Sequence, residues 1–245
     1  MTKIQVGDVE LQRFPAEGYA PIEDCYQQCE NAGLVVAPGN YLAQLRIAYP
    51  ESNSPAWKKV RGFTGSIVVT GNNQIVVAHA NHPLMTAKAI RDFKSDSNRF
   101  VNYGIVLTDE EFRSIVAPYK NNNEERRDVW YIDSDVLAQA DFVSDVVPAT
   151  VDATKRTLLV PYIGSKNPSD KAKYIKGHTN NLGSRIGVFF DSNALKESKF
   201  LVRPLWFGDG YINSLVGGGC SDGCVFGVSS SAVGTAQKKA LEDLL

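Results

Sequence analysis

Two runs of β-branched residues separated by a short turn constrain the fold of this chain more than any other feature. The segment 65–78 reads GSIVVTGNNQIVVA, and Gly71, Asn72 and Asn73 lie between the two runs. Isoleucine, valine and threonine favour strands. Glycine and asparagine tolerate the positive φ angles of a tight turn. The pattern predicts a β-hairpin, so the fold must contain antiparallel strands.

Further strands and helices follow one another irregularly. Other strands are expected at 3–6, 9–14, 157–162, 200–207 and 224–228. Helices are expected over 22–32, after Pro83 and from about residue 231. Five prolines between residues 15 and 55 exclude long helices from that part of the chain. This order lacks the regular rhythm of a doubly wound parallel sheet. We expect an α+β fold with a mixed, largely antiparallel sheet, several short helices and a C-terminal amphipathic helix.

A strand that runs into a polar cap and then a helix occurs three times in the middle of the chain. The strands are 104–107, 129–132 and 187–190. Thr108 and Glu111 have the spacing of a capping box, in which each side chain bonds the backbone N–H of the other residue. Since many strand-to-helix junctions converge on such caps, we interpret the three echoes as convergence rather than as a duplication.

The last two of these junctions resemble the opening strand of PIN-type nucleases. In that family the aspartate at the strand end, here Asp133 or Asp191, helps to hold a divalent metal. The resemblance covers nine residues or fewer each time. No glutamate occurs between Arg126 and Glu197, where the family's next acidic ligand would follow Asp133. We therefore interpret both aspartates as helix caps.

One polar stretch, residues 121–128, marks the expected boundary within the chain. It reads NNNEERRD and is expected to be an exposed loop. It would separate a β-rich N-terminal lobe, residues 1–120, from an α+β C-terminal lobe, residues 121–245. A single domain is the alternative, because 245 residues fit either arrangement.

The four cysteines form two C-x3-C pairs, Cys25 with Cys29 and Cys220 with Cys224. Four thiolates suit a tetrahedral zinc site, which makes these four residues candidate metal ligands, although structural zinc sites prefer a spacing of two residues. Cys25 and Cys29 also share the apolar face of the expected helix, so burial in the core is the alternative for the first pair. The second pair lies in a glycine-dense loop, where a local crosslink or thiol chemistry is the alternative.

The three histidines suggest a second metal site. His79 and His82 follow the hairpin, and with His178 they would supply the ligands of a three-histidine zinc site. The H-x-x-H motif lacks the carboxylate of H-E-x-x-H. The alternative is that these are turn residues whose ring nitrogens bond backbone groups.

Cys25 together with His79 or His82 also suggests a cysteine hydrolase. Cys25 lies near the expected start of a helix, where the helix dipole would lower the pKa of a thiol. The order of a helix cysteine before a strand histidine is similar to that of papain-type and cell-wall peptidase folds. The resemblance implies Cys25 as nucleophile and a histidine as base. The residues that follow Cys25, Tyr26-Gln27-Gln28, replace the small residues that those families place there.

Two basic stretches lie beside aromatic residues. Residues 58–61 follow Trp57, and residues 166–176 contain four lysines around Tyr174. Cations next to aromatic rings can bind phosphates or single strands. However, the chain has 26 Lys and Arg against 27 Asp and Glu, a formal net charge of −1, which argues against a general nucleic-acid binder. We interpret both stretches as solvated loops.

These observations favour a soluble, non-enzymatic structural, assembly or binding protein, for instance a subunit of a larger particle. We expect protein partners or homo-oligomers and no cofactor, and the predicted hairpin would offer an edge for pairing with a partner. The alternative is a cysteine- or metal-dependent hydrolase that uses Cys25 with His79 or His82, with zinc as the cofactor.

The expected location is the cytoplasm, or a particle assembled there. No window approaches the roughly 18 uninterrupted apolar residues of a membrane-spanning helix. The opening residues also lack the apolar stretch of a secretory signal.

Overall fold

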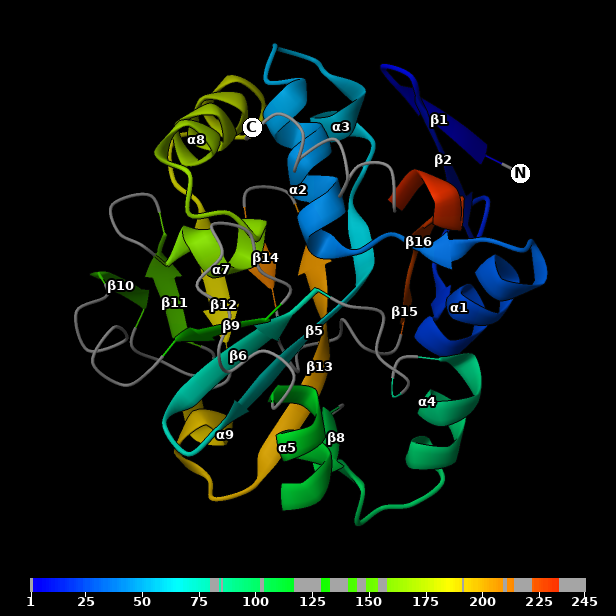
Figure 1. The fold of residues 1–245 in the computed structure, drawn as a ribbon, viewed down its shortest axis with the longest axis vertical. Helices are drawn as coiled ribbons and strands as arrows, with labels where there is room; N and C mark the ends of the chain where they lie inside the picture. Colours follow the sequence, from blue (N-terminus) through cyan, green and yellow to red (C-terminus); the bar gives the residue numbers. More distant parts are fainter. Residues whose placement is uncertain are drawn as a thin grey trace.

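The computed structural model describes residues 2–79, 84, 86–101, 104–116, 129–132, 141–144, 149–153, 158–190, 192–208, 211–213 and 222–233. In this part of the chain a mixed, mostly antiparallel sheet carries helices on both of its faces (Figure 1). The expected α+β class and the largely antiparallel sheet are confirmed.

The strands of the main sheet come from the whole length of the described chain. They are β1 Thr2–Val6, β2 Val9–Phe14, β4 Val35–Val36, β5 Gly62–Gly71, β6 Gln74–Ala78, β7 Phe100–Val101, β8 Gly104–Leu107, β9 Val129–Ile132, β10 Asp141–Ser144, β11 Ala149–Asp152, β12 Gly187–Phe190, β13 Phe200–Phe207, β14 Tyr211–Asn213 and β16 Val225–Val228. Strands β3 Ala20–Pro21 and β15 Asp222–Gly223 form a separate small sheet.

The main sheet follows the order β1-β2-β16-β5-β13-β14-β12-β11-β10, with β4, β6, β7, β8 and β9 paired beside this path. Two of its pairs, β5 with β16 and β12 with β14, are parallel, and the other described pairs are antiparallel. The predicted hairpin is confirmed as β5 and β6, and Asn72 and Asn73 adopt positive φ at its turn.

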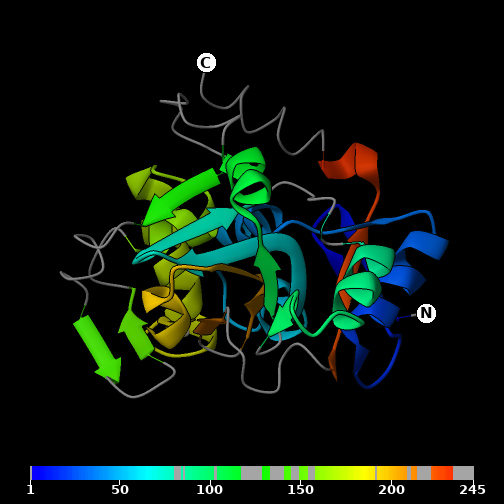
Figure 2. The ribbon, with the colours of Figure 1, turned by 90° about the horizontal axis from the view of Figure 1, so that it is seen from below.

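The described helices are α1 Ile22–Asn31, α2 Gly39–Ala48, α3 Pro55–Lys58, α4 Ala87–Lys94, α5 Asp109–Val116, α7 Leu159–Ile163, α8 Pro168–Asn181 and α9 Ser192–Lys196. Figures 1 and 2 show α1 and α4 side by side at one end of the sheet, and the two helices contact each other.

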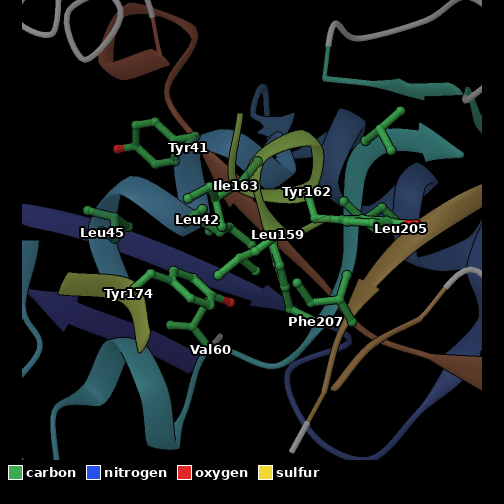
Figure 3. Close-up of a cluster of buried hydrophobic side chains, with 14 of the residues drawn as sticks. Tyr41, Leu42, Leu45, Val60, Leu159, Tyr162, Ile163, Tyr174, Leu205 and Phe207 are labelled. Carbon is green, nitrogen blue, oxygen red and sulfur yellow. The ribbon is translucent and has the colours of Figure 1, made fainter. Parts of the chain in front are cut away.

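The centre of the sheet is buried on both faces because its strands alternate between two apolar cores. In β5, Val68 packs into one core while Ile67 and Val69 pack into the other. The first core lies against α2, α3, α7 and α8, and Figure 3 shows its residues converging from α2, α7, α8 and β13. The second lies against α1, α4 and α5. Every residue of β5 is buried as a result, so this strand forms the centre of the described structure.

Local patterns in the sequence predict several elements correctly. Helix α1 buries Ile22, Cys25, Tyr26 and Cys29 on one face, as the spacing indicated. The capping box at α5 is confirmed: the Glu111 N–H donates to Thr108 Oγ1 at 3.2 Å, and the Thr108 N–H donates to Glu111 Oε2 at 2.8 Å.

The strand predicted at 157–162 is wrong over its described part, which enters helix α7. Leu159, Tyr162 and Ile163 are all buried, and a short run that is apolar throughout does not distinguish a buried strand from a buried helix. Gly164 then ends the helix with a left-handed φ of 68°.

The basic stretch at 166–176 is also not a loop, because it forms most of α8. Asn167 caps this helix by accepting from the Ser169 N–H at 2.9 Å, and Pro168 occupies its first turn. In addition, the ten-residue helix α2 fits between Pro38 and Pro50, where the sequence predicted no helix and the prolines excluded only a long one. Seven of the ten residues of α2 are buried, so it has no polar face to reveal a helical period.

The expected boundary at 121–128 lies outside the described residues, so the division into two lobes stays a prediction. Strands from both sides of that boundary pair in one sheet, as β5 does with β13. The chain enters a helical turn at residues 230–233, and the rest of the expected C-terminal helix lies outside the described part. Within the described residues, no helix has both the length and the apolar composition needed to span a bilayer.

Candidate functional site

His79 is the candidate catalytic residue with the most complete set of contacts. It follows β6 directly and is 1 % exposed. Its Nδ1 lies 2.9 Å from Ser66 Oγ, and the Asn40 N–H donates to the same nitrogen at 3.2 Å. Its Nε2 lies 2.7 Å from the carbonyl oxygen of Pro161. Four segments distant in sequence therefore meet at one imidazole.

These partners fix the tautomer of the His79 ring. Because Nδ1 accepts from the Asn40 N–H, the proton of the neutral ring lies on Nε2, which donates it to the Pro161 carbonyl. Ser66 Oγ accepts from the Gly39 N–H at 2.7 Å and donates its own proton to Nδ1. Each nitrogen of the ring is thus engaged within the fold.

The function of this network is visible at the start of α2. The residue before the helix, Pro38, supplies no side-chain cap. Instead Ser66 and His79 accept from the first two N–H groups of α2, those of Gly39 and Asn40. The first N–H groups of a helix have no partner within the helix, so the hairpin caps α2 from outside. This agrees with the alternative in which the ring nitrogens of His79 bond backbone groups.

Burial lowers the pKa of His79 from 6.5 to about 4, although the bond to the Pro161 carbonyl opposes this shift. The imidazole is therefore neutral at neutral pH. Ser66 and His79 have the spacing of a nucleophile and a base, but Ser66 is fully buried and His79 nearly so. Ser66 and His79 here bond backbone groups, the N–H groups at the start of α2 and the carbonyl of Pro161.

Cys25 lies in the first half of α1, and its thiol bonds neighbouring backbone. Its Sγ donates to the carbonyl oxygens of Ala20 and Gly223, both at 3.4 Å. Burial, followed by the neighbouring Cys224, raises the pKa of Cys25 to about 12. The pKa of this thiol is raised, not lowered as its place near the helix start predicted, and burial is the largest cause. No hydrogen bond joins Cys25 to His79.

The other described cysteines, Cys29 and Cys224, are also free and buried. Burial raises the pKa of Cys29 to about 12 and raises that of Cys224 as well. Cys224 donates from Sγ to the carbonyl oxygen of Arg61 at 3.1 Å. For Cys25 and Cys29, this environment agrees with the alternative of core thiols. Cys220, the fourth candidate metal ligand, lies outside the described residues.

His178, the third histidine, lies at the core side of α8. Its Nδ1 is 2.7 Å from the carbonyl oxygen of Gly183, and its ring meets that of Trp57 edge-on, with centroids 5.9 Å apart. His82, Asp133 and Asp191 lie outside the described residues, so the three-histidine site and the caps on these aspartates stay predictions. Among the described residues, no three His, Cys, Asp or Glu side chains gather closely enough to hold a metal ion.

Sequence patterns did not indicate Asn40 or Ser66 as partners of His79. A local signal is the serine at position 66 inside a fully buried strand, because a buried hydroxyl needs a partner. Comparison with family models, with curated proteins and with solved structures finds no match to this chain. The function is therefore argued from the geometry of the described residues.

Proposed function

We propose that this protein works by association, as a non-catalytic protein that assembles with a second copy of itself through the edge of β9 that no described strand pairs with. The observation that carries this proposal is the position of β9 in the sheet. Strand β9 pairs with β6 along one side and with no other described strand. A strand edge of this kind is a template on which another strand can pair.

The side chains of β9 fit this use. The strand reads VWYI and contains neither a charge nor a proline, the residues with which proteins commonly protect sheet edges. Tyr131 is 41 % exposed, whereas Val129, Trp130 and Ile132 are buried. Tyrosine is enriched at protein interfaces because its ring is apolar while its hydroxyl bonds water or a partner.

A second copy of this chain is the partner that we expect to pair with this edge. Two identical antiparallel edges related by a two-fold axis present the same groups to each other, so the contact is self-complementary and closed. The hydrolase alternative draws less support, since the thiol of Cys25 is protonated and both nitrogens of His79 are engaged.

The test is the oligomeric state of three proteins, measured by size-exclusion chromatography with light scattering from low to high micromolar concentration. We expect the wild-type chain to form dimers. Tyr131→Lys, which places a charge at the edge, should weaken self-association about tenfold or more. Tyr19→Lys is the matched control, because Tyr19 is 67 % exposed and directly precedes β3, which belongs to the separate small sheet. A wild-type chain that stays strictly monomeric at high concentration would refute the proposal.

A further inference from the structure

Two basic stretches that are far apart in sequence lie on helices that contact each other, or directly beside them. Helices α3 and α8 contact each other, and the rings of Trp57 and Tyr174 pack with centroids 4.9 Å apart. Lys58 donates from Nζ to the carbonyl oxygen of Asn181, the last residue of α8, at 2.6 Å. Figure 1 shows both helices at the same end of the molecule. We call the surface formed by Lys58, Lys59, Lys173 and Lys176 the α3–α8 face.

The cations of this face are available to a partner. Lys173 and Lys176 lie three residues apart on the exposed side of α8, which makes them neighbours. Lys59 is also exposed. None of these three forms an ion pair with a described residue, whereas Lys3, Lys88 and Lys94 on other elements each pair with a carboxylate.

Few carboxylates of the described part of the chain oppose these lysines. Asp170, the acidic residue of α8, is buried and accepts from Ser165 Oγ at 2.7 Å. Glu51 is exposed in the loop beside α8. The backbone carbonyl of Glu51 accepts from Asn181 Nδ2. The net charge of −1 averages over the whole chain and does not describe this face, which attracts anions.

The residues around these lysines favour one class of anionic partner over the others. Trp57 and Tyr174 are fully buried, so their rings cannot stack on the bases of a single strand. The large apolar residues exposed in the described chain are Tyr19, Val101 and Tyr131, none of them on α3 or α8, so nothing here would enter a bilayer. Protein interfaces are depleted of lysine. Lysines beside hydroxyls, here of Ser169 and Thr179, are typical of contacts to a phosphate backbone.

We propose that the α3–α8 face binds the phosphate backbone of double-stranded nucleic acid without reading its sequence. This inference goes beyond the self-association proposed for β9 and does not depend on it. Binding of this kind arises from the release of counterions when lysines neutralise phosphates, so its affinity falls steeply as salt is added.

The experiment measures fluorescence anisotropy of a labelled, mixed-sequence DNA duplex of about 20 base pairs between about 50 and about 200 mM salt. If Lys59, Lys173 and Lys176 each neutralise one phosphate, the logarithm of the binding constant should fall with that of the salt concentration with a slope of about −3. The double variant K173Q/K176Q should lose about two units of this slope and bind at least about tenfold more weakly at low salt.

The matched control is K3Q/K88Q, which also removes two exposed lysines but outside the α3–α8 face. It should change the dissociation constant by less than about twofold. Thermal unfolding of both variants verifies that they are folded. The proposal is overturned if the wild-type chain does not bind the duplex at low salt, or if the two variants lose affinity equally. Tighter binding to phosphatidylserine vesicles or to single-stranded DNA than to the duplex also overturns it.

Discussion

At the scale of single residues, His79 shows how a reactive side chain becomes part of the framework. A histidine normally titrates near neutral pH. Here the ring is buried, accepts from the Asn40 N–H and donates to the Pro161 carbonyl. Burial is the larger cause of its low pKa, and the opposing contribution comes from the Pro161 carbonyl rather than from a charged side chain. Protonation would also place a donor on Nδ1, against the N–H of Asn40.

The pH dependence of stability follows from this geometry. The unfolded ring binds a proton below about 6.5 and the folded ring only below about 4. The unfolded state therefore carries more protons in this window, and the free energy of unfolding falls as the pH falls through it, by about 3 kcal/mol in total from this residue. Urea unfolding at about pH 7.5 and about pH 4.5 measures the loss.

The comparison that isolates His79 is the variant His79→Gln, which does not titrate. It is less stable at neutral pH, because the network is disturbed, but should lose less stability than the wild type on acidification. Carboxylates that titrate in the same range contribute equally to both proteins. An equal loss in wild type and variant would mean that His79 does not control the acid response.

At the scale of elements, α8 depends on close contact with α3 rather than on an apolar stripe. Its core side contains Asp170, Tyr174, Gly177, His178 and Asn181, of which only Tyr174 is a large apolar residue. Trp57 fills the space above Gly177, and its Nε1 donates to the Arg46 carbonyl at 3.2 Å. The absence of a side chain at Gly177 therefore permits the two helices to approach.

Gly177→Ala tests this contact. A Cβ at this position would lie 2.7 Å from Cζ2 of Trp57, closer than a real contact allows. Alanine favours a helix interior by about 1 kcal/mol over glycine, but overpacking a well-packed core costs about 1–3 kcal/mol. Since Trp57 is fully buried and cannot yield easily, we expect lower stability in chemical denaturation. Thr179→Ala, on the exposed side of α8, should change stability by less than about 0.5 kcal/mol. A stabilised G177A variant would contradict this packing argument.

At the scale of the whole molecule, the central position of β5 ties the described parts of the chain together. Strand β5 pairs with β6 from its own hairpin and with β13 and β16 from later in the chain. The first core likewise combines residues of α2 with residues of α7, α8 and β13 (Figure 3). Burial of apolar surface by both halves together is the main favourable term in folding.

A fragment of residues 1–120 tests whether the N-terminal half folds without the rest. It lacks β13, β16 and two of the helices that cover the first core, α7 and α8. We expect no cooperative urea transition and no near-ultraviolet circular dichroism signal, because β5 would lose two of its neighbours. The full chain measured under the same conditions is the control. A fragment that unfolds cooperatively would instead support the division into two lobes.

The sequence by itself determined the elements whose signals are local. The hairpin of β5 and β6, the buried cysteine face of α1 and the capping box at Thr108 and Glu111 each depend on residues a few positions apart. Only the tertiary structure decided the helical state of α7 and α8 and the partners of His79. The core side of α8 reads as polar in sequence, and Asn40, Ser66, His79 and Pro161 meet only after the chain has folded. The physical reason is that periodicity records which side of an element is apolar, whereas contacts between distant residues carry no local pattern.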